Sequence, residues 1–278
     1  MKRSKRSKGV SISTIIGLAI GMFCVVYGIM GAGHIGSFIN APSFFIIVGG
    51  SVGSVVTSFP GSKLKNFGAV LRSAFYTPKI NLPKDIQTLV EISSFARSKG
   101  TLALENLADE YSHDAFLHKG ILMIADGTSK ETLVTNLKSE ISYMKKRHTT
   151  GQAMVSMFGD NATSLGLLGT YIGLIPMLEN LENPASLGPL MALELVSSFY
   201  GAFISYVVFT PLANRLKAFS ADEVLRNNLI IDGLVSIQEG QSPRVVEERL
   251  LGALTKKEAK KMSKTKQKKD PIKLKEVA

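Results

Sequence analysis

The sequence lacks the residues on which several common protein classes depend. It has no tryptophan among 278 residues and a single cysteine, Cys24. Because an intramolecular disulfide needs two cysteines, a disulfide framework within the chain is excluded. The four histidines have neither metal-ligand spacing nor a cysteine companion, so no metal site is expected. No acidic residue precedes Asp85. These absences argue against a disulfide-bonded or zinc-binding domain.

Lysine and arginine are missing from two long stretches, although the chain contains 33 of them. The basic residues fall in blocks 1–8, 63–147 and 215–275, and the gaps 9–62 and 148–214 are largely apolar. Each gap is long enough to cross a bilayer twice, at about 20 residues per crossing. Basic residues are retained on the cytoplasmic side, so both hairpin turns are expected outside. The sequence thus predicts an all-α integral membrane protein with four transmembrane helices, a helical cytoplasmic domain and both termini in the cytoplasm.

This pattern divides the chain into six segments. They are a basic N-terminus (1–9), a first transmembrane hairpin (10–60), a cytoplasmic helical domain (61–157), a second hairpin (158–213), C-terminal helices (214–255) and a Lys-rich tail expected to be disordered (256–278). The spans are expected at about 10–30, 43–59, 161–178 and 190–213.

Start and stop signals predict helices in the cytoplasmic parts. Pro83 opens a helix that Gly100 ends, and a second helix follows at about 102–111. Capping-box spacing from Thr128 to Glu131 opens a long helix, which no proline separates from the third span. After the fourth span, helices are expected at about 214–238 and 244–254.

Two features that are typical of other protein classes, a glycine motif and a high positive charge, do not indicate those classes here. Gly31, Gly33 and Gly36 match a dinucleotide fingerprint, but they follow a membrane helix and lack an acidic residue about 20 positions on. The net charge of +11 is explained by membrane orientation, and no aromatic residues interleave the basic runs, so no nucleic acid partner is expected. No cofactor and no enzymatic activity are expected either.

Small and polar residues line one face of each helix in the second hairpin. In the third span they are Thr163, Gly166, Thr170 and Gly173, with Gly169 beside them, and in the fourth they are Glu194, Ser198, Gly201 and Ser205. Two interpretations stay open: a close helix-helix seam, or a polar pathway, because an intramembrane acid usually faces protein or water. Glu194 is about one turn from the outer end of its predicted span, so contact with headgroups is a further alternative.

Particular segments resemble the flagellar stator subunits of the MotA/PomA family, within the MotA/TolQ/ExbB superfamily. The resemblance covers about residues 10–255, in an order of two spans, a large insert and two more spans. It is carried by LGLLGTYIGLIPML (165–178), NPASLGPLMA (183–192), FYG (199–201), PLA (211–213), SPRVVEERL (242–250) and RSKGTLALE (97–105).

The resemblance implies a torque generator of the bacterial inner membrane. Several copies, about five by family resemblance, would surround a MotB/PomB-type subunit that is anchored to peptidoglycan and supplies the ion-carrying aspartate. The transported ion would be H⁺ or Na⁺, and the rotor switch protein FliG would be the cytoplasmic partner. Membrane lipid would surround the spans.

The resemblance also assigns roles to individual residues. Thr170 and Ser198 fall on the ion path and Pro211 on the functional proline of the fourth span, while Arg97, Lys99 and Glu105 fall on the rotor-facing charged patch. Two positions of the path depart from the family: Thr163 stands where a proline is usual, and Glu194 where a small apolar residue is usual. For Arg97 and Glu105 a second explanation is open, because each also suits the macrodipole of its helix.

Three functions therefore compete. The first is a flagellar stator subunit, with Thr170 favouring sodium over protons. The second is an ExbB/TolQ-like energising subunit, against which the four-span layout argues. The third is a non-conducting membrane scaffold whose small-residue faces serve assembly only.

Overall fold

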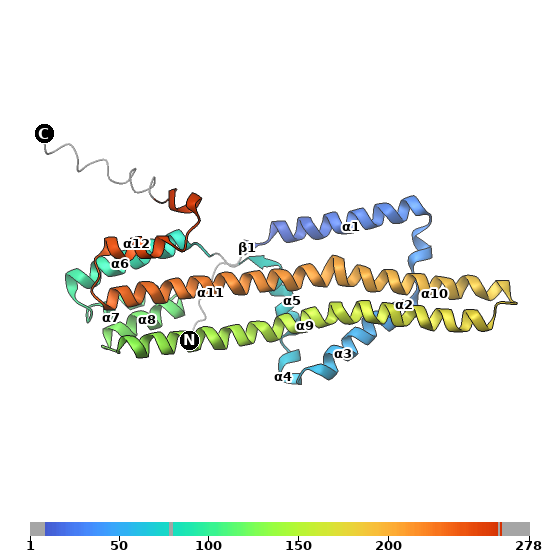
Figure 1. The fold of residues 1–278 in the computed structure, drawn as a ribbon, viewed down its shortest axis with the longest axis horizontal. Helices are drawn as coiled ribbons and strands as arrows, with labels where there is room; N and C mark the ends of the chain where they lie inside the picture. The colour runs from blue at the N-terminus through green and yellow to red at the C-terminus, as the bar shows by residue number, and fades with distance from the viewer. Residues whose placement is uncertain (1–8, 78–79, 261, 263–278) are drawn as a thin grey trace. The chain divides into compact units, whose positions relative to one another are not determined.

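The computed structural model describes residues 9–77, 80–260 and 262 (Figure 1). The chain forms two compact units. We call residues 9–77 with Lys146–Ser220 the hairpin unit, and residues 80–145 with the described residues from Ala221 onward the insert unit. Each unit is built from segments distant in sequence, because two long helices run through both.

The hairpin unit contains the four apolar segments that the charge pattern predicts. The first span is α1 (Ile12–Ala32). The second is a continuous run of α2 (Ala41–Phe44), the π-helix η2 (Phe45–Gly49) and α3 (Gly50–Ser58). The third lies in α9 (Lys130–Glu179), and the fourth in α10 (Pro184–Ala202) and the π-helix η4 (Phe203–Phe209), which continue into α11 (Thr210–Gln238). Four helices are thus long and apolar enough to cross a membrane, which confirms the prediction.

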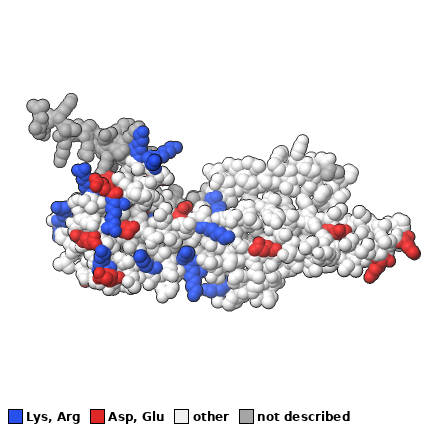
Figure 2. Space-filling model, in the orientation of Figure 1, with Lys and Arg blue, Asp and Glu red and all other residues white. Residues whose placement is uncertain are grey.

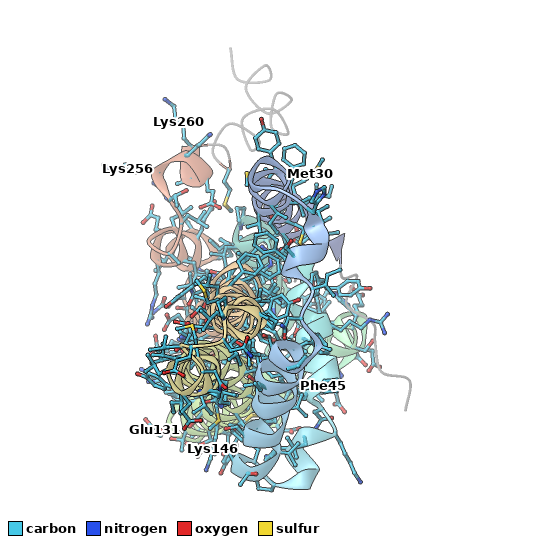
Figure 3. All side chains as sticks on the ribbon, turned by 90° about the vertical axis from the view of Figure 1, so that its right-hand side faces the viewer. Met30, Phe45, Glu131, Lys146, Lys256 and Lys260 are labelled. Carbon is cyan, nitrogen blue, oxygen red and sulfur yellow. The ribbon has the colours of Figure 1, made fainter. Side chains whose placement is uncertain are left out.

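The outer surface of the hairpins is apolar, as lipid contact requires. Phe45 is 72% exposed and Met30 is 64% exposed, and Figure 3 shows both side chains on the outside of their helices. In Figure 2 this surface is largely white, and the stretch 148–214 carries no Lys or Arg and only four acidic residues.

Two helix boundaries differ from the sequence-based expectation. The expected helix from residue 214 does not start there, because α10, η4 and α11 follow one another without a break from Pro184 to Gln238. The cap of α9 is Ser129, whose hydroxyl accepts a hydrogen bond from the Thr132 amide (3.3 Å), and not Thr128. The expectation that this helix enters the third span uninterrupted is confirmed by its 50 residues.

Short elements connect the hairpins. η1 (Ile35–Phe38) lies in the turn of the first hairpin, and α4 (Gly61–Leu64) and α5 (Phe67–Ala74) follow the second span. A two-residue strand β1 (Gly9–Val10) pairs antiparallel with β2 (Tyr76–Thr77), a contact for which the sequence gives no pattern.

The insert unit is a bundle with its own apolar core. Its helices are α6 (Leu82–Lys99), α7 (Leu104–Ala108), η3 (Asp109–Tyr111), α8 (Ala115–Ala125) and α12 (Pro243–Leu251), packed with the ends of α9 and α11. Gly100 ends α6 with φ +85°, a conformation that favours glycine. The fully buried side chains include Leu89, Ile121, Leu137 and Leu234.

The start of the Lys-rich tail is ordered, contrary to expectation. Residues 256–260 are helical, and the Thr255 hydroxyl and amide both donate to the Glu258 carboxylate (2.6 and 3.0 Å). This cap explains why the helix restarts there. Residues 261 and 263–278 of the tail, like the basic residues 1–8, lie outside the described residues.

Candidate functional site

Glycines bring the third and fourth spans into backbone contact. A Cβ on Gly201 would lie 2.6 Å from the Ala162 carbonyl oxygen and 2.9 Å from the Gly166 Cα, and one on Gly166 would lie 3.0 Å from the Ser197 carbonyl oxygen. No side chain fits between α9 and α10 at this level. Such close approach is what small residues permit in lipid, where packing drives helix association.

The same seam, which we call the glycine seam, continues toward the ends of both helices. Gly169 faces Ser197, whose Cβ and Oγ would lie 2.5 Å from an added Cβ, and Gly173 faces the backbone and Cβ of Glu194 at 3.0–3.1 Å. Gly173 is six residues before the end of α9, about 9 Å at 1.5 Å per residue. Glu194 is half-buried against α9 and lies ten residues into α10.

A buried hydroxyl network joins the second span to the seam. Ser197 is 0% exposed and donates a hydrogen bond to Ser43 (2.9 Å), which is also 0% exposed. The Ser43 hydroxyl lies 3.0 Å from the Asn40 side-chain oxygen and 3.3 Å from the Leu193 carbonyl oxygen. Nearby, Tyr200 donates to the Phe38 carbonyl oxygen (2.5 Å). These bonds fix the rotation of α10 about its axis.

The predicted ion-path hydroxyls lie outside this network. Ser198 is exposed, because it is one helix position beyond the buried Ser197. Thr170 is half-buried, and its hydroxyl donates to the Leu167 carbonyl oxygen (2.6 Å) within its own helix. Ser198 is therefore accessible to another molecule, and Thr170 is partly accessible.

Thr163 and Pro211 show how the helices accommodate unusual positions. Thr163 is half-buried, its hydroxyl lies 3.5 Å from the Gly159 carbonyl oxygen, and α9 passes through it unbroken. Pro211 is exposed at the second residue of α11, directly after the seven-residue π-helix η4. A proline removes one helical hydrogen bond and displaces the preceding turn, which a wider π turn tolerates.

One further acidic residue, Asp160, lies at the inner start of the third span. Asp160 is exposed and is the only acid between Glu140 and Glu179. The neighbouring Asn161 donates to the Ser54 hydroxyl in the second span (2.8 Å), so Asp160 lies beside α3 and not beyond its end. The signal was present in the sequence, since a single acid in a stretch without basic residues is costly in a membrane.

The predicted rotor-facing residues surround a turn of the insert unit. Arg97 and Lys99 are in the last turn of α6, and Glu105 is in the first turn of α7, with Gly100 between them. All three side chains are exposed, and none has an ion-pair partner in the described part of the chain.

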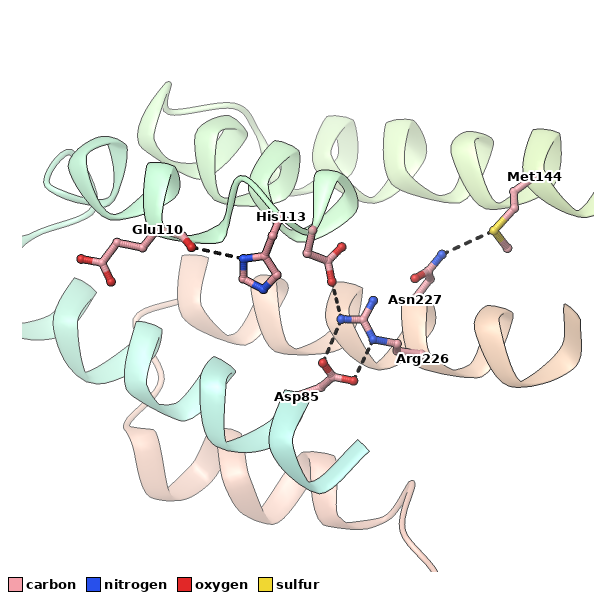
Figure 4. A network of polar contacts seen from close by, with 7 residues as sticks. Asp85, Glu110, His113, Met144, Arg226 and Asn227 are labelled. Atoms are coloured by element: carbon pink, nitrogen blue, oxygen red, sulfur yellow. Dashed lines mark hydrogen bonds and ion pairs between the residues drawn. The ribbon is translucent and has the colours of Figure 1, made fainter. Parts of the chain in front are cut away.

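A buried ion triad holds this unit together, and the sequence did not reveal it (Figure 4). Arg226 of α11 binds Asp85 of α6 through two hydrogen bonds of 2.8 Å and also donates to Asp114, which precedes α8. The pKa of Arg226 is lowered by burial, but the hydrogen bonds and charges of both aspartates outweigh that effect and raise it above its usual value. The guanidinium is therefore charged throughout the physiological range.

Among the residues that the structure describes, no group of three or more His, Cys, Asp or Glu side chains could hold a metal ion. In the stretch 148–214 the only charged side chains are four carboxylates, and the other polar groups are hydroxyls, amides and the His148 imidazole.

The architecture defines a multi-span membrane protein with a large helical insert between two apolar hairpins. The MotA/TolQ/ExbB proton channel family matches residues 108–229, and the motility protein A N-terminal family matches residues 15–100. Motility protein A of Cereibacter sphaeroides is 36% identical over 249 residues, which cover 90% of this chain and 97% of that protein. Chemotaxis protein PomA of Vibrio alginolyticus is 36% identical over 239 residues, or 86% and 93% of the two chains.

A solved structure agrees with these sequence matches. A chain of the flagellar MotAB stator complex from Bacillus subtilis superposes with a TM-score of 0.84 at 33% identity, covering 90% of this chain and 98% of that one. The protein therefore belongs to the MotA/TolQ/ExbB proton channel family, among the flagellar stator subunits represented by motility protein A and PomA.

Proposed function

We propose that this chain conducts H⁺ or Na⁺ jointly with a MotB/PomB-type partner and converts the ion flow into torque on the flagellar rotor. It acts in the bacterial inner membrane, with both termini in the cytoplasm, as a homo-oligomer around a partner anchored to peptidoglycan. Its cytoplasmic contact is the rotor switch protein FliG. It performs no enzymatic reaction and requires no resident cofactor.

The observation that carries this proposal is the contrast between the glycine seam and the hydroxyls beside it. The space between α9 and α10 is closed, because a Cβ added at Gly201 or Gly166 would lie only 2.6–3.0 Å from backbone atoms of the facing helix. Ser198 beside the seam is exposed and Thr170 is half-buried, so a second chain can reach both side chains. A conducting path built on these hydroxyls therefore needs a neighbouring molecule to complete it, as in a complex of two kinds of subunit.

The exposed charges of the insert unit support the contact with the rotor. Arg97, Lys99 and Glu105 have no partner within the described chain, so their charges are free to pair with another protein. Exposed pairs contribute little each, roughly 0–1 kcal/mol, which suits a contact that must form and break repeatedly.

The choice of ion follows from the hydroxyls. A sodium ion that leaves water needs oxygen ligands, whereas a proton can pass along water and a carboxylate. Thr170 supplies a hydroxyl and Ser198 a second one, so we assign sodium as the transported ion.

The test is the rotation speed of tethered cells that carry this chain and its partner as their only stator, over a range of external sodium at fixed proton-motive force. We expect speed to rise with sodium, and Thr170→Ala to raise the sodium concentration for half-maximal speed by about tenfold. Pro211→Ala should leave the complex assembled yet reduce torque.

Thr57→Ala is the matched control, because Thr57 is an exposed hydroxyl of the second span that donates to its own helix at Gly53 (2.9 Å). It should rotate like the parent. Speed that does not depend on sodium would refute the assignment of the ion, and a parent complex that rotates no cells would refute the proposed function itself.

A further inference from the structure

One arginine joins three segments at the end of the hairpin unit where Pro211 lies. Arg215 donates from Nε to the Ala74 carbonyl oxygen of α5 (3.0 Å) and from Nη2 to the Ser11 hydroxyl, which precedes α1. Its Nη1 lies 3.5 Å from the Ser13 hydroxyl, and its guanidinium carbon lies 4.6 Å from the centre of the Phe219 ring. A single side chain thus connects α11 with α5 and with the start of the first span.

Ser11, which accepts a hydrogen bond from Arg215, is itself held in place by other hydrogen bonds. Ser11 is only 4% exposed, caps α1 by accepting from the Thr14 amide and hydroxyl, and donates its own amide to the Phe75 carbonyl oxygen (2.9 Å). The pairing of β1 with β2 continues this contact by two residues. The first span therefore begins directly after the short β1–β2 pair, and the hydrogen bond from Arg215 to Ser11 connects this point to α11.

The contact with α5 is favourable on two counts. Ala74 is fully buried and is the last residue of α5, so its carbonyl belongs to the negative end of that helix. Ala74 also packs in a small apolar cluster with Leu212 and Leu216 of α11, one on each side of Arg215 along the helix. The hydrogen bond thus lies at the edge of a packed contact.

The position of this contact along α11 suggests its role. Pro211 precedes Arg215 by four residues, about one turn, and leaves the start of α11 with one helical hydrogen bond fewer. Movement of the fourth span at this point must either carry the neighbouring segments along or slide past them. A side chain that binds across both neighbours prevents sliding.

We propose that Arg215 is a positioning residue for torque: it fastens the start of α11 to α5 and to the beginning of the first span, so that these segments move together. The proposal rests on the proposed function. Ion passage itself does not use Arg215, so the residue acts on the coupling of ion flow to rotation. The planar fork of an arginine binds two acceptors at once, which a lysine cannot do in the same geometry.

The experiment compares Arg215→Gln and Arg215→Lys with the control Lys217→Gln. Lys217 is an exposed residue of the same helix, and its replacement removes the same charge as Arg215→Gln. The purified complex with its partner is examined by hydrogen exchange of the segment 9–14, by ion uptake into vesicles and by tethered-cell rotation under high load. For Arg215→Gln we expect exchange to rise about tenfold and torque to fall while ion uptake persists. Arg215→Lys should be intermediate, and Lys217→Gln should match the parent.

Ser11→Ala gives an independent check, because it removes the acceptor and not the arginine. If both residues act through one contact, the double variant loses no more torque than the worse single variant. Full additivity, unchanged exchange in Arg215→Gln, or raised exchange with parental torque would each overturn the proposal. So would ion uptake that falls in parallel with torque. If the parent complex itself drives no rotation, the proposed function is refuted, and the role of Arg215 with it. This outcome differs from the others because it is seen in the parent, without any variant.

Discussion

Replacing Gly201 by alanine tests the glycine seam most directly. The added methyl carbon would lie 2.6 Å from the Ala162 carbonyl oxygen, 2.9 Å from the Gly166 Cα and 3.4 Å from the Gly166 nitrogen. All three are backbone atoms, so no side chain can rotate aside to make room. The helices α9 and α10 must therefore separate or tilt.

The expected cost follows from two opposing effects. Overpacking a closed interior costs about 1–3 kcal/mol, and relief of the helical cost of glycine returns up to about 1 kcal/mol. We expect Gly201→Ala to lower the free energy of unfolding by about 1–2 kcal/mol on balance. Because Ser197 lies on the same seam, the hydroxyl network with Ser43 should be displaced too.

Gly28→Ala is the matched control. It is also a helical glycine in a span, but a Cβ there meets nothing within 4 Å. It should change stability by less than about 0.5 kcal/mol. Both variants are compared with the parent by denaturant titration of the purified complex in detergent and by cell rotation. Equal stability of the two variants would refute the argument that the seam is closed by backbone contact.

Three further outcomes are expected. Asp114→Asn breaks a buried ion triad and should destabilise the complex by about 3–5 kcal/mol, whereas Lys119→Met removes an exposed pair and should cost less than about 1 kcal/mol in the same titration. Charge reversal at Arg97 or Glu105 should reduce swimming at an unchanged level of membrane-inserted protein, and loss of the protein would instead support the macrodipole explanation. In a Cys24→Ser background, a cysteine at Ser37 should react with an impermeant thiol reagent from outside the cell and one at Ser129 should not; labelling at Ser129 would overturn the topology.

The four spans were predictable because the signals for them are local. Lipid excludes charged side chains, so the stretches without Lys and Arg mark the spans regardless of how the rest of the chain folds. Helix ends are equally local, as Gly100 shows with its positive φ. The one-residue error at the cap of α9 arose because Thr128 and Ser129 are both hydroxyl residues, and only the helix geometry selects between them.

The partners of each polar residue were not predictable in the same way. Helical spacing places Ser197 and Ser198 only one position apart, and the choice of which one is buried depends on where the second span lies against α10. Spacing did identify the glycines of the seam as a face, but not the backbone atoms that they meet.

Contacts between distant segments were decided by the tertiary structure alone. Arg226 gives no signal in the sequence, because Asp85 and Asp114 are more than 100 positions away, and Arg215 meets Ser11 across 204 positions. By itself, the sequence determined what each segment is, since solvation by lipid or water acts on each residue separately. Only packing determined which segments meet, because a hydrogen bond or an ion pair needs both partners in place.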